Sequence, residues 1–160
     1  ESETAKGKKG RIFIKVNSMT DPDVIRKLSE ASEAGVKIRM IVRGICCLLP
    51  GVSKRTENIH IVNVVGRYLE HSRVYIFGSG KKERMYISSA DLMTRNTEKR
   101  VELAFPVIDP KVRGRIKNTL LLNYMDNVKG RRLDSEGCYR RKEVKGNPVN
   151  SQQRLMEEQI

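Results

Sequence analysis

The stretch that decides the fold is RIFIKVNSMTDPDVIRKLSEASEAGVKIRMIV, residues 11–42. Its first six residues, RIFIKV (11–16), alternate apolar and other side chains with the period of two that is typical of a strand. Asp21-Pro22 then combines a good N-cap residue with proline at the first helical position, and an apolar stripe follows. VKIRMIV (36–42) is a second, more apolar strand. The order strand, helix, strand predicts a right-handed crossover and parallel pairing in a sheet that is covered on both faces.

Working outward, the chain continues to alternate strand and helix patterns. A loop with a short helical turn is expected after the second strand, before the next apolar run. The predicted elements are strands over 59–65, 73–78, 84–89 and 100–107 and a helix that starts at Asp109-Pro110. The turn-rich SGKKE joins the second and third of these strands into a hairpin, and Pro106 places the last strand at a sheet edge.

These elements predict one α/β domain over residues 11–126, with a mixed, largely parallel sheet flanked by helices. Residues 1–10 are expected to be a flexible basic segment. Residues 127–160 are expected to be a basic and largely irregular tail, with a short helix over 150–158. The chain starts at Glu1 without a methionine, so it is interpreted as an excised piece of a larger protein.

The formal net charge of +13 predicts an anionic partner: nucleic acid, nucleotide, phosphate polymer or acidic lipid. Part of the excess positive charge lies in KGRRLDSEGCYRRKEVK (129–145). A solvated tail without a partner would also explain these charges. This segment lacks the interleaved aromatic residues of a single-strand stacking surface. Nucleic acid is therefore disfavoured as the partner, and a non-enzymatic basic module that binds nucleic acid is kept as an alternative.

The chain has three cysteines and two histidines, without a C-x-x-C pair, so it offers no recognisable metal site. Free thiols fit a reducing cytoplasm. No apolar run approaches the roughly 20 residues that span a bilayer, and the charged start lacks the apolar segment of a secretion signal. A cytoplasmic location is predicted, and peripheral membrane association is left open.

Arg43 directly follows the strand at 36–42, at the point where a long loop begins. Ligands of open α/β sheets bind beyond the carboxyl ends of parallel strands. A guanidinium group at this position is suited to hold phosphate oxygens in pairs. The alternative is a structural arginine that caps carbonyl groups or pairs with a carboxylate.

His71 lies just before the strand at 73–78, where an imidazole can exchange a proton near neutral pH or bond a phosphate oxygen. Downstream, ISSADLMTRN (87–96) supplies hydroxyl, carboxylate, guanidinium and amide groups that suit orienting a histidine or binding an anion. These candidates are Ser88, Ser89, Asp91, Arg95 and Asn96. A purely structural histidine and a helix N-cap in SSAD are the alternatives.

HSR (71–73), ISSAD (87–91) and RVELAFPVIDP (100–110) resemble the second half of a phospholipase D superfamily active site. The usual pattern there is H-x-K, then G-S-x-N and a downstream acidic residue. Arg73 stands in place of the lysine and Gly78 in place of the aspartate of that motif, and Ser88 and Asp91 replace its glycine and asparagine. These departures disfavour an ordinary phospholipase D-like phosphodiesterase, which is kept as an alternative function.

Longer stretches resemble polyphosphate kinase, the family that reversibly moves the terminal phosphate of ATP onto inorganic polyphosphate. They are residues 15–51, LEHSRVYIF (69–77) and YISSADLMTRN (86–96), and the likeness is nearly continuous from Lys15 to Pro110. The resemblance implies a phospholipase D-like fold, ATP, ADP and polyphosphate as ligands, and magnesium bound with ATP.

By the same resemblance, Arg43 contacts the nucleotide phosphates, and His71 lies at the nucleotide and catalytic centre and assists proton or phosphate transfer. The phosphorylated histidine and the magnesium-linked residues belong to an earlier half that this chain does not contain. His60 has no motif around it and does not replace that histidine. Upstream domains of the same chain and a homo-oligomer are the implied partners. This fragment alone is therefore expected to be inactive.

A long anionic polymer also needs cations along its path. By location and charge, Arg67, Arg73 and Arg95 are candidates to line it, with a surface arginine or an ion pair as the alternative.

Overall fold

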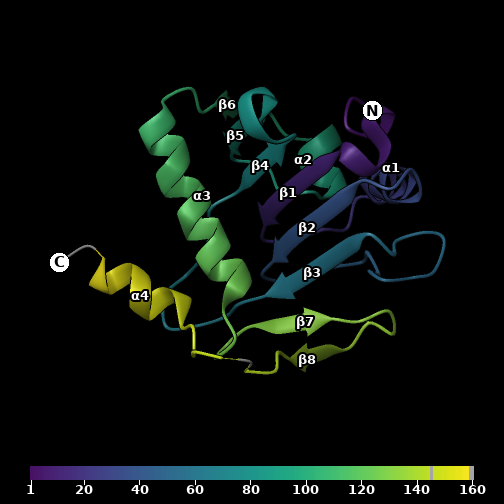
Figure 1. Cartoon of the computed structure of the whole chain (residues 1–160). Helices are drawn as coiled ribbons and strands as arrows, with labels where there is room; N and C mark the ends of the chain where they lie inside the picture. The colour runs from purple at the N-terminus through teal and green to yellow at the C-terminus, as the bar shows by residue number, and fades with distance from the viewer. Residues whose placement is uncertain (145, 159–160) are drawn as a thin grey trace.

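The computed structural model describes residues 1–144 and 146–158, and these residues form one eight-stranded sheet (Figure 1). The strand order is β6-β5-β4-β1-β2-β3-β7-β8. The strands are β1 (Arg11–Val16), β2 (Lys37–Val42), β3 (Ile59–Asn63), β4 (Val74–Phe77), β5 (Arg84–Ser88), β6 (Ala104–Pro106), β7 (Arg131–Leu133) and β8 (Tyr139–Arg141). The helices are α1 (Pro22–Glu33), α2 (Thr94–Glu98), α3 (Pro110–Met125) and α4 (Ser151–Glu157), with short 3₁₀ turns η1 (Thr4–Lys9) and η2 (Gly80–Lys82).

Parallel pairing is confined to the centre of the sheet. β1 pairs in parallel with β2, and β2 with β3, as predicted for the segment that decides the fold. The other neighbouring strands among the described residues are antiparallel. The sheet is mixed, but less parallel than expected, because short hairpins such as β4–β5 and β7–β8 join antiparallel neighbours.

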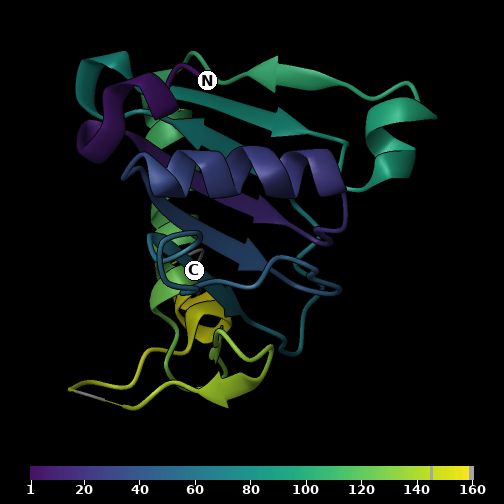
Figure 2. The same ribbon diagram turned by 90° about the vertical axis from the view of Figure 1, so that its right-hand side faces the viewer.

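Helices cover both faces of the sheet, with α1 on one side and α3 crossing the other (Figures 1 and 2). Alternate residues of β1 serve the two layers: Ile14 packs in the core under α1, and Phe13 packs edge-on against Tyr124 of α3, with ring centroids 5.6 Å apart. The predicted caps are present. The carboxylates of Asp21 and Asp109 accept from the third backbone N–H beyond them, at 3.0 and 2.8 Å.

The segment after Asp126 is more regular than the sequence suggests. Strands β7 and β8 form a hairpin that extends the sheet from β3, so the prediction of little fixed structure is wrong for residues 131–141. Most residues of this hairpin are charged or polar, but Leu133 is 3% exposed and packs in the main core. The short helix expected over 150–158 is present as α4.

Two further segments differ from the sequence-based expectation. Residues 1–10 are expected to be flexible, but Glu3 is buried and its carboxylate accepts from the Arg11 backbone N–H at 3.1 Å, which ties η1 to β1. The strand expected over 100–107 is limited to β6 at the sheet edge, where Pro106 was expected to end it. The alternating apolar pattern there does not mark a buried face, since Val101 is 97% exposed.

Candidate functional site

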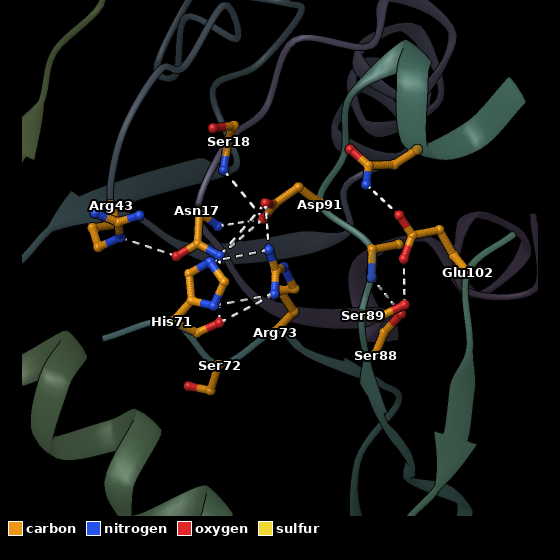
Figure 3. Close-up of polar contacts among 12 residues, drawn as sticks. Asn17, Ser18, Arg43, His71, Ser72, Arg73, Ser88, Ser89, Asp91 and Glu102 are labelled. Atoms are coloured by element: carbon orange, nitrogen blue, oxygen red, sulfur yellow. Dashed lines mark hydrogen bonds and ion pairs between the residues drawn. The ribbon is translucent and has the colours of Figure 1, made fainter. Parts of the chain in front are cut away.

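The candidate site lies where β1 and β2 end and where the loop from β3 to β4 returns to the sheet. Asn17 directly follows β1, Arg43 directly follows β2, and His71 lies in the loop before β4. Figure 3 shows these side chains together, with Asp91 arriving from the segment after β5. The structure therefore brings residues far apart in the sequence to one end of the central parallel strands, where ligands of α/β sheets bind.

Asn17 links the two main candidates. Its side-chain oxygen accepts from Arg43 Nε at 3.0 Å, and its side-chain amide donates to the His71 carbonyl at 3.4 Å. The Asn63 amide also donates to the carbonyl of Arg43 at 2.6 Å. Among the described residues, the terminal guanidinium nitrogens of Arg43 have no hydrogen-bond partner. Arg43 is thus fixed through Nε, and the paired donors of its outer edge are open to an anion.

The ring of His71 is exposed and lies against the guanidinium of Arg73. The closest approaches are 3.3 Å from Arg73 Nη2 to His71 Nε2 and 3.5 Å from Nη1 to Nδ1. A guanidinium has only donors, so only a ring nitrogen that carries no proton can accept a hydrogen bond from Arg73. The contact gives the imidazole a cationic neighbour without burying it.

Asp91 holds Arg73 in place. Its Oδ2 accepts from Arg73 Nη2 at 3.0 Å, and its Oδ1 accepts from the backbone N–H groups of Asn17 and Ser18 at 2.6 and 3.3 Å. The side chain of Asp91 is buried. Burial raises the pKa of this carboxyl group, but the hydrogen bonds and the charge of Arg73 outweigh it and keep the pKa below its ordinary value. Asp91 is therefore an anchoring carboxylate.

Two other members of the predicted polar cluster, Ser89 and Asn96, bond to Glu102, and Ser88 lies beside Ser89 on the right of Figure 3. The carboxylate of Glu102 accepts from Ser89 Oγ and from the Asn96 side-chain amide. Ser88 Oγ donates to the Leu103 carbonyl at 2.8 Å. These three predicted residues tie the segment after β5 to the approach of β6, and the structure does not bring them into contact with His71.

Arg67 and Arg95, proposed from location and charge, are both exposed. The Arg67 guanidinium lies over the ring of the next residue, Tyr68, 5.6 Å from its centroid. The sequence analysis missed Asn17 and Lys15, which do contact the loop of His71. A signal for Asn17 was present, since it is the first polar residue beyond the carboxyl end of a predicted parallel strand.

The family model named Polyphosphate kinase C-terminal domain 2 matches residues 1–153. This chain belongs to that polyphosphate kinase family. The expectation drawn from the motifs around Arg43, His71 and Asp91 is confirmed at the level of the family.

Curated relatives named polyphosphate kinase are similar over most of the chain. The protein of Staphylococcus epidermidis is 52% identical over 94% of this chain, and that of Pseudomonas aeruginosa 46% identical over 98%. The chain spans about a fifth of the length of these relatives, 21% and 23%.

Solved structures agree with this placement. The crystal structure of polyphosphate kinase from Porphyromonas gingivalis matches with a TM-score of 0.90 and 41% identity, covering 99% of this chain and 25% of that one. The phospholipase D family member Nuc from Salmonella typhimurium matches with a TM-score of 0.59 and 17% identity, covering 82% and 89%. The latter likeness shows the fold alone, and it bears out the phospholipase D-like fold class.

Within this polyphosphate kinase domain, no three His, Cys, Asp or Glu residues of the described ranges are grouped so that they could hold a metal ion. None of the helices in the described ranges is long and apolar enough to cross a membrane.

Proposed function

We propose that this domain supplies ATP-binding and catalytic groups to the reversible transfer of the terminal phosphate of ATP to inorganic polyphosphate. The observation that carries the proposal is the bridge made by Asn17, which holds Arg43 and the His71 loop at the same end of the sheet. The family supports this assignment, since relatives over most of the chain are named polyphosphate kinase.

Each side chain has a distinct part in this proposal. Arg43 binds phosphate oxygens through the outer edge of its guanidinium group, where bidentate donors match the geometry of the anion. His71 donates a hydrogen bond or a proton to a phosphate oxygen as charge develops during transfer. Arg73, held by Asp91, adds positive charge beside the imidazole. Phosphoryl transfer depends mainly on such positioned cations and donors.

The proposal extends to the whole protein. The phosphorylated histidine and the residues linked to magnesium lie outside this chain, in upstream domains that are its partners, and magnesium arrives with ATP. The full-length protein is a cytoplasmic homo-oligomer. The catalytic half-domain comprises residues 11–126 together with the β7–β8 hairpin, which extends its sheet, and α4, which contacts α3. Arg67, Arg73 and Arg95 contribute positive charge to the polyphosphate path.

The test compares Arg43→Ala with Arg43→Lys in a full-length kinase that contains this chain. The alanine variant is expected to lose about 100-fold in kcat/KM for ATP, because it removes a charged donor from the transition state. Lysine keeps the charge but loses the paired donors, so it is expected to recover only part of the activity. Steady-state rates in both directions measure the effect, and normal rates in Arg43→Ala would overturn the assignment.

A diester substrate separates this function from that of a phosphodiesterase. Turnover of bis(p-nitrophenyl) phosphate by the wild-type chain, abolished by His71→Ala, would favour the phospholipase D-like alternative. We expect none, because Arg73 replaces the lysine of the superfamily pattern and is paired with Asp91.

A further inference from the structure

The loop that carries His71 has no regular secondary structure between Gly66 and Arg73, yet it is tied to the molecule at several points. Its backbone and side chains form hydrogen bonds with β1, α3 and α4. The contact with α4 was not expected, since that helix lies in the segment interpreted as a basic and largely irregular tail.

Gln152 of α4 makes the connection. Its side-chain oxygen accepts from the Tyr68 backbone N–H at 3.1 Å, and its side-chain nitrogen donates to the Tyr68 carbonyl at 2.8 Å. The side chain thus pairs with both backbone groups of one loop residue, as a neighbouring strand would. Gln152 is 5% exposed, and a Cβ atom on Gly66 would lie 2.3 Å from its side-chain oxygen.

Glu70 is the second tie. One carboxylate oxygen accepts from Gln152 at 3.4 Å and the other from the Asn123 amide of α3, also at 3.4 Å. The same carboxylate lies 3.8 Å from Lys15 Nζ. Two helices and the central strand β1 therefore converge on the residue that directly precedes His71.

Lys15 is the third tie, on the other side of His71. Its side chain is 2% exposed, and Nζ donates to the carbonyls of Glu70 and Ser72 at 3.0 and 3.1 Å and to Ser72 Oγ at 2.9 Å. A buried ammonium group is costly unless it is paired and hydrogen-bonded, so these partners are held tightly. The backbone on both sides of His71 is fixed by one nitrogen.

Helix α4 can act as a fixed support because Asp126 joins it to the end of α3. The Asp126 carboxylate is fully buried and accepts from Ser151 N and Oγ, both at 2.8 Å, and from the Lys129 backbone N–H at 2.8 Å. Ser151 directly precedes Gln152. The position of Gln152 is thus set relative to α3, which itself packs on the sheet.

We propose that Gln152 is a positioning residue for His71, acting through Tyr68 and Glu70 to hold the loop in the geometry that phosphoryl transfer requires. The inference rests on the proposed function of His71. It assigns a catalytic purpose to α4, which contributes no group to the candidate site itself.

The experiment uses a full-length kinase that contains this chain and compares Gln152→Ala with Gln153→Ala. Gln153 is the matched control: it has the same side chain, lies one position along α4, and donates to Glu157 instead of to the loop. Gln152→Ala is expected to lower kcat about tenfold with a smaller change in KM, because misplacement of a reacting group is felt mainly in the transition state. Hydrogen exchange in a peptide over 66–73 is expected to accelerate, and Gln153→Ala should change neither.

A second variant guards against a general loss of folding. Gly66→Ala places a methyl group against the Gln152 side chain, so it is expected to lower kcat as well. The double variant Gly66→Ala, Gln152→Ala removes that clash and should be no slower than Gln152→Ala alone, a non-additivity that independent damage would not give.

His71→Ala, measured alongside, separates the two proposals. Loss of transfer in His71→Ala but wild-type kcat in Gln152→Ala would overturn the positioning role and leave the proposed function standing. Wild-type transfer in His71→Ala would overturn the catalytic role proposed for His71, and the positioning role of Gln152 with it, whatever hydrogen exchange in the loop shows.

Discussion

The two histidines of the chain both lie beside an arginine, but in regions of different construction. His60 alternates outward from β3, and its Nδ1 is 3.2 Å from Arg132 Nη2 on β7. It lines an open groove of about 470 Å³ on the face of the sheet that α3 crosses. Around His71, by contrast, Arg73 is anchored by a buried carboxylate and the backbone is held from both sides. An arginine beside a histidine is therefore not enough to indicate a site. The two regions differ because a buried carboxylate fixes Arg73 and hydrogen bonds fix the loop of His71.

The largest expected difference between the two regions is catalytic. In a full-length kinase, His71→Ala should lower the rate of phosphate transfer by about 100-fold or more, the usual contribution of a positioned general acid or base. His60→Ala should leave the rate within about twofold, because His60 lies near the amino end of β3, away from the carboxyl ends of the parallel strands where Arg43 lies. Steady-state kinetics check both, and equal losses would remove the distinction.

The next effect concerns the anchor. Asp91→Asn removes the charge that pairs with Arg73 and is expected to lower the free energy of unfolding by about 3 kcal/mol, since it leaves a largely buried guanidinium without its partner. The matched control is Asp23→Asn, which breaks an exposed pair with Arg26 and should lower the free energy of unfolding much less, because water screens an exposed ion pair. Urea unfolding measures both, and equal costs would mean that Asp91 does not anchor the site.

The third test concerns the pH dependence of the contact between Asp126 and α4. Burial raises the pKa of the Asp126 carboxyl, but hydrogen bonds from Ser151, Lys129 and Gly130 outweigh it and leave the pKa lowered. A carboxyl whose pKa is lowered in the folded state stabilises the protein above its ordinary pKa, near 4, and this contribution is lost as pH falls through the folded-state value. We therefore expect α4 to detach on acidification below about pH 4. Hydrogen exchange over 146–158 checks this, and Asp126→Asn should abolish the pH dependence while raising exchange at neutral pH.

The sequence was most informative where local patterns coincide with the fold. Alternating residues over 11–16 and the Asp-Pro helix starts predicted the central strands, α1 and α3, because period and capping are local properties. The edges were less predictable. The run that ends in β6 alternates but is exposed at Val101, and the arginine-rich β7–β8 hairpin depends on burial of Leu133, which no periodicity reveals.

For the candidate site, sequence position picked out Arg43, His71, Arg73 and Asp91, which the structure places near one another, since polar residues at strand ends converge in α/β sheets. Their roles stay predictions. It also grouped Ser88, Ser89 and Asn96 with His71, although Ser89 and Asn96 bond to Glu102 and Ser88 bonds to the Leu103 carbonyl. No sequence pattern pointed to Gln152, because its partner in the loop lies 84 residues earlier in the chain and such a distant contact leaves no local pattern.

The smallest expected effect concerns the ring of His60. Burial lowers the pKa of this imidazole, and the charges of Arg132 and Arg39 lower it further. Arg132→Ala is expected to raise the pKa of His60 toward its ordinary value, because it removes a cation 3.2 Å from the ring. Arg131→Ala is the matched control on the same strand, and it should leave that pKa unchanged. Imidazole NMR of this chain, which has two histidines, follows both rings in one titration. The His71 signal should be the same in both variants, since its cationic neighbour is Arg73, and a shift of His71 in Arg132→Ala would mean that the two regions are coupled through the sheet.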